Sequence, residues 1–236
     1  MQFITDVLDE VMDLFPSKVI HIGGDEIKYD HWVESPTIRK YMKKNDLVTP
    51  SDLHVHFTNK ISDYLESNGR RMMGWNEIVG VNIHDYQKGA GDAISNIELS
   101  KHAIVQFWIG SDELLRQAAE NDFDIVNSNV VFTYLDYDYK DIPLSKAYSF
   151  DPIPKGLDVK YHKHIIGSGC QMWSEWIPSI GQLHYQVFPR IAALAEVGWT
   201  DKKNKDFQIF KRRLKKLQQQ WKKRGIRFAP DFIDEK

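Results

Sequence analysis

KVIHIGGDEI, residues 18–27, joins an apolar strand to two adjacent carboxylates. Its first residues are apolar and β-branched, as in a buried strand, and Gly23 and Gly24 then interrupt the strand period. Neighbouring side chains of a strand point to opposite faces. Asp25 and Glu26 can therefore share one site only where that period has ended. The stretch predicts a strand whose carboxyl end carries a pair of acids, although the pair could equally cap a following helix.

Helical and strand patterns alternate along the rest of the chain. An apolar pattern of helical spacing ends at Pro16. A second helix is predicted to start after Thr49-Pro50-Ser51 and to run to Asn68-Gly69, and a third covers SDELLRQAAEN, residues 111–121. QLHYQVFPRIAALAEVGW predicts a helix interrupted near Pro189. The further strands expected are in RRMMGWNEI, HAIVQFW, DIVNS and, after a long loop, HIIGSGCQMW. This order favours parallel strands with helices packed outside, in a barrel or a doubly wound sheet.

Composition excludes several classes of partner. The chain has 236 residues, of which 42% are hydrophobic, and a formal net charge of -2, so no whole-molecule field would gather nucleic acid or anionic lipid. A terminal amphipathic helix at 206–225 has a basic face, which we interpret as a solvated surface because no nucleic-acid motif accompanies it. No segment reaches the roughly 20 apolar residues of a membrane span. The sequence therefore predicts neither a nucleic-acid nor a membrane partner.

The expected strand exits carry aromatic and acidic side chains. Trp75 with Glu77, Trp108, and Trp173 with Glu175 each follow a predicted strand. A single tryptophan usually packs in a core, but three at equivalent positions would converge on the mouth of a barrel. Because an indole stacks on the C–H face of a sugar and a carboxylate accepts bonds from its hydroxyls, this pattern indicates a carbohydrate site.

These motifs together resemble a known family. HIGGDE, GWNEI, QFW, YLDYDY and QMWSEW occur in this order and at these separations in the β-N-acetylhexosaminidases of glycoside hydrolase family twenty. The resemblance runs to about Trp199 and covers the later part of the family's catalytic barrel. It implies a glycosidase that removes terminal β-linked N-acetylglucosamine or N-acetylgalactosamine from an oligosaccharide or glycoconjugate. We expect no cofactor and no metal.

The resemblance also implies catalytic roles. Glu26 would be the general acid and then the base, with its pKa raised by the neighbouring charge of Asp25. The substrate's own 2-acetamido oxygen would attack the anomeric carbon, with retention of configuration through an oxazolinium intermediate. Asp25 would hold the acetamido N–H, and Tyr134 would donate its hydroxyl to the acetamido oxygen.

Five further residues would bind the sugar, again by resemblance. Trp173 would form the floor beneath the ring, and Trp75 and Trp108 would wall the acetamido pocket. Asp136 and Glu175 would accept bonds from the 4- and 6-hydroxyls.

A complete (β/α)₈ barrel needs eight strands, and about five βα units are counted here. The fold class expected is therefore α/β, a TIM-barrel type that lacks its early strands, over a single domain of residues 1–236. Exposed sheet edges favour pairing, so we expect self-association, a fragment of a longer enzyme, or completion by another chain. Family members are often secreted, periplasmic or lysosomal, but MQFITDVLDEVMDLF lacks the order of a secretory signal and leaves the compartment open.

Three rival interpretations stay open. A non-catalytic carbohydrate-binding fragment would keep the tryptophans without turnover. A GGDEF-type nucleotide cyclase would need phenylalanine where Ile27 stands and a second metal-binding acid before the motif. Metal sites at His54 and His56, or at His162 and His164, would lack a shared helix face or a third ligand. His21 is expected to be a hydrogen-bonded structural residue.

Overall fold

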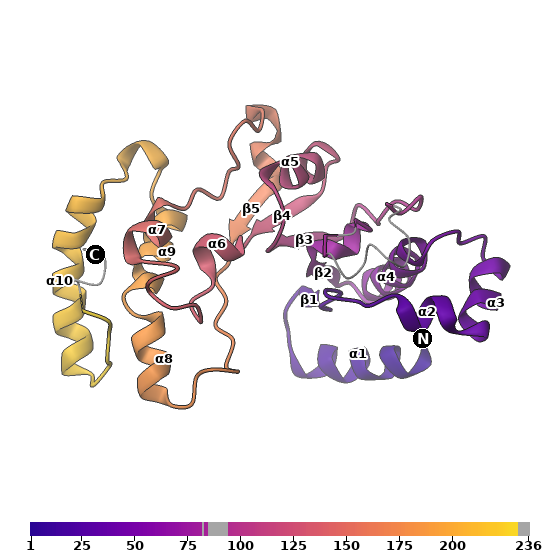
Figure 1. Ribbon diagram of the computed structural model, residues 1–236, viewed down its shortest axis with the longest axis horizontal. Helices are drawn as coiled ribbons and strands as arrows, with labels where there is room; N and C mark the ends of the chain where they lie inside the picture. Colours follow the sequence, from indigo (N-terminus) through magenta and orange to yellow (C-terminus); the bar gives the residue numbers. More distant parts are fainter. Residues whose placement is uncertain (82, 85–93, 231–236) are drawn as a thin grey trace. The chain divides into compact units, whose positions relative to one another are not determined.

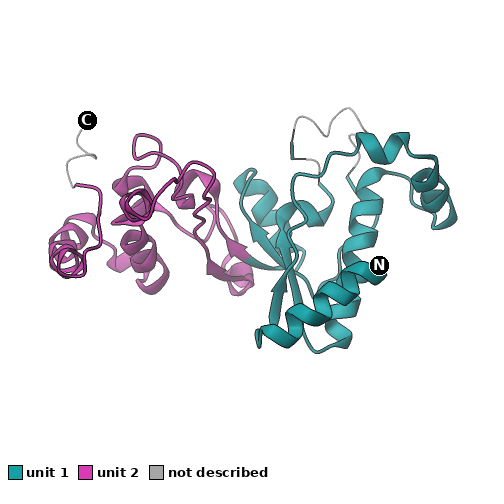
Figure 2. Ribbon diagram, turned by 90° about the horizontal axis from the view of Figure 1, so that it is seen from below, with its two compact units in different colours: residues 1–125 teal, residues 126–236 magenta. Residues whose placement is uncertain are grey.

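The computed structural model describes residues 1–81, 83–84 and 94–230. They divide into two compact units, residues 1–125 and residues 126–236, which are coloured separately in Figure 2. The prediction of a single domain stays a prediction.

The strands follow one another in chain order. The described residues contain five, β1 (Val19–His21), β2 (Arg71–Trp75), β3 (Ile104–Phe107), β4 (Asp124–Asn127) and β5 (Ile165–Ser168). Their order in the sheet is β1-β2-β3-β4-β5, and the boundary between the units falls inside β4. The first three strands pair in parallel, with Ile20 opposite Met72 and Met73 opposite Ile104. A parallel sheet in unbroken chain order is the pattern of a barrel, whereas a doubly wound sheet reverses order at a switch point.

Helices precede and connect the strands of unit 1 (Figure 1). They are α1 (Gln2–Leu14), α2 (Asp30–Glu34), α3 (Pro36–Lys44), α4 (Pro50–Ser67), the 3₁₀ turn η1 (Asn76–Val79) and α5 (Asp112–Glu120). α4 packs against β2, and its apolar face buries Val55, Ile61 and Leu65. β3 is buried along its whole length, as expected for an inner strand of a parallel sheet.

Unit 2 is mainly helical in its described part. Its elements besides the strands are α6 (Val130–Thr133), α7 (Leu144–Ser149), the 3₁₀ turns η3 (Val159–His164) and η4 (Lys202–Asn204), α8 (Ile180–Val187), α9 (Arg190–Trp199) and α10 (Phe207–Lys223). α7 packs on α9, and Tyr148 of α7 stacks on Phe210 of α10 at 4.8 Å between ring centroids. The core of this unit therefore lies between these three helices.

Four sequence expectations need correction. The connection after β4, expected as a loop, contains α6 and α7, and the segment after β1 contains α2 and α3. The fifth strand is shorter than expected, because regular pairing ends at Ser168 and resumes only as an isolated bridge between Tyr134 and Gln171. His162 and His164 lie in η3 rather than in a strand.

Among the described residues, none of the helices combines the length and the apolar character that crossing a bilayer requires. Within the same residues, no group of three or more His, Cys, Asp or Glu side chains is placed to hold a metal ion.

Candidate active site

The turn after β1 is left-handed at three of its residues. Gly23 and Gly24 have φ of 75° and 90°, and Glu26 has φ of 52°. A Cβ at Gly24 would lie 2.6 Å from Ile78 Cγ2, so both the backbone conformation and the space require glycine. A glutamate in this conformation is strained, and such strain concentrates at functional sites. The two glycines thus end the extended backbone of β1, and Asp25 and Glu26 lie in the turn at its carboxyl end.

His21 and β2 hold this turn in place. The Gly23 N–H donates to Nδ1 of His21 at 3.1 Å, and the Gly23 carbonyl accepts from the Trp75 N–H at 2.9 Å. Desolvation lowers the pKa of His21, although the negative charge of Asp25 and a hydrogen bond with Gln106 both act to raise it. His21 is therefore a hydrogen-bonded structural residue, as expected.

Behind the turn lies His54 of α4, which is 2% exposed. Its ring packs against the Gly24 backbone, and neither ring nitrogen has a partner in hydrogen-bonding geometry among the described residues. Burial lowers the pKa of His54 to about 4, so the imidazole is neutral at physiological pH. Local sequence patterns do not indicate that His54 packs behind the turn, because Gly24 lies far from it along the chain.

The alternative that Asp25 and Glu26 cap a helix is wrong. The segment that follows them is irregular, and α2 begins only at Asp30. Its N-cap is Tyr29, which makes no side-chain capping bond. Asp25 is half-buried and Glu26 is exposed at the carboxyl end of β1.

Two of the predicted tryptophans meet in unit 1. Trp75 is 8% exposed, and its ring stands edge-to-face to Trp108 at 6.2 Å and to His21 at 5.0 Å between centroids. Asn76 and Glu77, which follow Trp75, both hydrogen-bond to Trp108. The sequence pattern groups Glu77 with the acids that could meet a sugar, but the structure shows its carboxylate bound to the Trp108 indole.

The other four predicted residues lie in unit 2. Leu135 N–H donates to the Gln171 carbonyl at 2.8 Å, and Gln171 N–H donates to the Thr133 carbonyl at 3.2 Å, which aligns the two segments that carry these residues. Tyr134 is 6% exposed, Trp173 is 45% exposed, and Glu175 is exposed. The structure thus brings the tyrosine and the exposed tryptophan onto neighbouring segments.

Asp136, two residues after Tyr134, interacts electrostatically with the segment that carries Trp173 and Glu175. Burial raises the pKa of Asp136, and the nearby charge of Glu175 adds to that rise, while backbone N–H groups, including that of Trp173, and the charge of Arg190 oppose it. Its Oδ1 is buried and has no hydrogen-bond partner in the described part of the chain. Buried unsatisfied carboxylate oxygens are costly and are typical of functional positions.

Arg190 organises the loop around Asp136, and sequence analysis missed it. Its fully buried guanidinium donates to the carbonyls of Leu135 at 2.6 Å and Tyr137 at 2.9 Å, on either side of Asp136. It also donates to Gln186, both to the carbonyl and to the side chain, and its Cζ lies 4.1 Å from the centre of the Tyr139 ring. In the sequence it stands in a largely apolar stretch, FPRIAALAEVGW, and the carbonyls that it binds lie far away along the chain.

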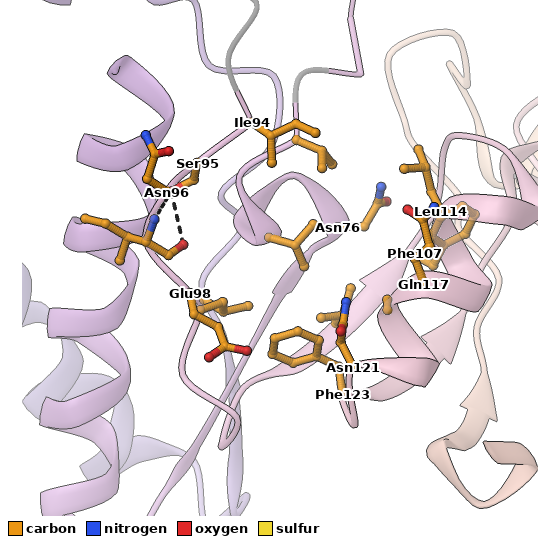
Figure 3. A pocket seen from close by; sticks show the side chains of 16 residues that line it. Asn76, Ile94, Ser95, Asn96, Glu98, Phe107, Leu114, Gln117, Asn121 and Phe123 are labelled. Atoms are coloured by element: carbon orange, nitrogen blue, oxygen red, sulfur yellow. Dashed lines mark hydrogen bonds between the residues drawn. The ribbon is translucent and has the colours of Figure 1, made fainter. Parts of the chain in front are cut away.

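A cavity of about 340 Å³ opens on the helix side of β3. Figure 3 shows that Phe107 of β3 and Leu114 of α5 point into it from one side, and Ser95 and Asn96 lie on the other. Asn76 reaches it, but none of the eight predicted site residues lines it. The cavity is therefore separate from the predicted site residues of unit 1.

Comparison with known proteins decides the family. Residues 1–202 match the model of "Glycosyl hydrolase family 20, catalytic domain". The chain belongs to glycosyl hydrolase family 20. The resemblance drawn from HIGGDE and the four accompanying motifs is confirmed.

Relatives from family 20 are hexosaminidases. The beta-hexosaminidase of Porphyromonas gingivalis is 32% identical over 224 residues, which are 90% of this chain and 27% of that protein. The solved exo β-N-acetylglucosaminidase of Vibrio harveyi, in complex with N-acetylglucosamine, superposes with a TM-score of 0.83 at 29% identity and covers 98% of this chain. The chitobiase of Flavobacterium johnsoniae superposes with a TM-score of 0.79 at 31% identity.

The chain spans about a third of the length of these family 20 proteins, with shares of 27%, 36% and 32%. Together with the parallel sheet in chain order, this confirms the predicted fold class of an incomplete TIM-barrel type. That the chain is a fragment, or is completed by another chain, stays a prediction.

Proposed function

We propose that this protein is a β-N-acetylhexosaminidase that releases terminal β-linked N-acetylglucosamine or N-acetylgalactosamine by a retaining, substrate-assisted mechanism. The observation that carries the proposal is the left-handed turn of Gly23, Gly24 and Glu26, which sets the two adjacent carboxylates at the end of β1 and is bonded to the Trp75 N–H through the Gly23 carbonyl. Family membership supports it, as does a solved Vibrio harveyi relative described as inactive when one aspartate is replaced by alanine.

In the first step the substrate supplies its own nucleophile. The acetamido carbonyl oxygen bonds to the anomeric carbon as the glycosidic bond breaks, and Glu26 gives its proton to the leaving oxygen. Asp25 accepts the acetamido N–H and stabilises the positive charge of the oxazolinium ion. Tyr134 donates its hydroxyl to the acetamido oxygen and so orients it for attack.

In the second step a water molecule attacks the anomeric carbon and gives its proton to the Glu26 carboxylate. The oxazolinium ring opens, the acetamido group is restored, and two inversions leave the configuration unchanged. Glu26 therefore acts first as acid and then as base.

Binding roles follow from the side chains available. The exposed ring of Trp173 offers a face for the sugar, and Trp75 with Trp108 offers apolar walls for the acetamido methyl. Asp136, whose Oδ1 is unsatisfied among the described residues, and the exposed Glu175 would accept bonds from the 4- and 6-hydroxyls. The partner is thus an N-acetylhexosamine-containing oligosaccharide or glycoconjugate.

The test is release of the aryl alcohol from aryl β-glycosides of N-acetylglucosamine, N-acetylgalactosamine and glucose. Turnover confined to the acetamido sugars supports substrate assistance. Glu26→Gln should lower kcat by at least about 100-fold for 4-methylphenyl glycosides and by much less for 2,4-dinitrophenyl glycosides, which need no general acid. Glu34→Gln, at an exposed position on α2, is the matched control. Sugar binding without any hydrolysis would instead indicate a carbohydrate-binding fragment.

A further inference from the structure

Glu77 is a buried carboxylate that holds one indole. It lies in η1 and is 1% exposed. The Trp108 Nε1–H donates to both of its oxygens, at 3.0 Å to Oε2 and 3.2 Å to Oε1. Nε2 of His84 bonds to the same Oε1 at 2.8 Å. Both oxygens of this carboxylate thus face side chains rather than solvent.

The residue before it holds the backbone of the same tryptophan. Oδ1 of Asn76 accepts the Trp108 N–H at 2.9 Å, and Nδ2 of Asn76 donates to the Ile109 carbonyl at 2.9 Å. Asn76 is 3% exposed, so these bonds are shielded from water. Two consecutive residues at the end of β2 therefore hold Trp108 at its backbone and at its indole nitrogen.

Ring contacts restrict the indole on other sides. Trp75 stands edge-to-face to Trp108 at 6.2 Å, and His84 lies tilted to it at 5.8 Å between ring centroids. Turning the indole over would take its N–H away from Glu77 and leave a buried carboxylate short of a partner, which is costly. Core packing alone would not need a charge here, because an apolar side chain could fill the same space.

We propose that Glu77 is a positioning residue that fixes the Trp108 indole and thereby sets the width of the pocket for the N-acyl group of the sugar. The proposal rests on the proposed function, in which Trp75 and Trp108 wall that pocket. With the indole fixed, the pocket accepts a two-carbon acyl group and excludes longer ones. Glu77 would then determine specificity without touching the substrate.

The first measurement needs no activity. In protein with ¹⁵N-labelled tryptophan, the Trp108 indole N–H signal is assigned by its loss in Trp108→Phe. Glu77→Gln keeps the side-chain shape but removes the charge, so this signal should move and its hydrogen exchange should speed up about tenfold. Glu98→Gln, an exposed carboxylate in the same unit, is the matched control and should leave the signal in place. An unmoved signal in Glu77→Gln would overturn the proposal.

The second measurement tests specificity. Aryl glycosides of N-acetylglucosamine and N-butanoylglucosamine are compared in the wild-type chain and in Glu77→Gln. The ratio of their kcat/KM values should fall about tenfold in the variant, chiefly through a lower KM for the butanoyl substrate. An equal loss on both substrates would show a merely structural role and overturn the proposal.

The two measurements separate this proposal from the proposed function. If the wild-type chain turns over neither glycoside, the same pair of acyl sugars is compared by binding, followed through the indole signals. Binding of neither sugar would remove the proposed function and the pocket-width claim with it. The first measurement would still decide whether Glu77 holds Trp108.

Discussion

His54 is expected to make the turn after β1 sensitive to acid. The pKa of this buried histidine is about 4 in the folded chain, against an ordinary value of 6.5. Below pH 6.5 the unfolded chain takes up a proton that the folded chain binds only near pH 4. Stability must therefore fall as pH drops through that window. The difference between the unfolded and folded pKa values of His54 corresponds to about 3 kcal/mol of unfolding free energy lost at pH 4.

We expect His54→Leu to flatten this pH dependence, because leucine fills a similar space and does not titrate. The measurement is urea unfolding between pH 7 and pH 4. His31→Leu, at an exposed position on α2, is the control and should leave the slope unchanged. A variant as acid-sensitive as the wild type would show that other groups cause the loss.

Local sequence patterns predicted some residues of the candidate site and missed others. His21, Asp25 and Glu26 were found because they stand in one motif at a strand end. His54 and Arg190 were not, because the groups they contact lie far away in sequence. His54 packs against Gly24, and Arg190 donates to the carbonyls of Leu135 and Tyr137. Contacts of this kind leave no local spacing to detect.

At the scale of elements, the start of α4 depends on Asp52. Its carboxylate is 1% exposed and accepts the N–H groups of Val48 and Thr49 at 2.9 Å and that of Asn96. Burial works to raise the pKa of Asp52, but these backbone N–H groups prevail and hold it below its ordinary value. The residue thus completes a capping box with Thr49 and ties α4 to the segment that precedes β3.

Asp52→Ala should lower the unfolding free energy by about 3 kcal/mol, since it leaves several buried N–H groups without an acceptor. Thr49→Ala removes a single capping bond and should cost about 1 kcal/mol. Chemical denaturation of both variants at pH 7 measures the difference. Because the pKa of Asp52 is lowered, its contribution is present above its unfolded pKa and is lost as pH falls toward the folded value. Equal costs in the two variants would contradict a role beyond the helix cap.

Elements were predicted well where their own residues specify them. α1, α4 and α5 carry apolar periodicity, and Thr49 with Pro50 and Gly69 marks the ends of α4. The short helices α2, α3, α6 and α7 were missed. α7 has only six residues, and its Tyr148 hydroxyl donates to Glu196 of α9 at 3.0 Å, so tertiary contacts stabilise a helix that would not persist alone.

At the scale of the whole molecule, each unit exposes large apolar side chains. In unit 1 these include Phe3 at 76% and Leu14 at 74% of α1, and in unit 2 Trp176 at 84% and Trp199 at 92%. β1 and β5 stand at the ends of the strand order, so among the described residues each has one strand neighbour. Exposed apolar surface and unpaired strand edges favour association.

We expect the purified chain to self-associate at high micromolar concentration, as light scattering coupled to size exclusion would measure. Replacing Phe3 and Leu14 by lysine should reduce the apparent mass. Val48→Lys, at a position 78% exposed, is the control and should have little effect. A wild-type chain that stays monomeric over the whole concentration range would contradict the expectation.

The sequence by itself determined the alternation of helices and strands, the end of β1 at two glycines, and the family, because periodicity, turn residues and motif order are local properties of the chain. Tertiary structure alone decided that Glu26 is left-handed, that His54 is neutral behind the turn, that Arg190 holds the Asp136 loop, and that Glu77 holds Trp108. These depend on burial and on partners brought together by folding, which set the pKa of an imidazole and the orientation of a ring.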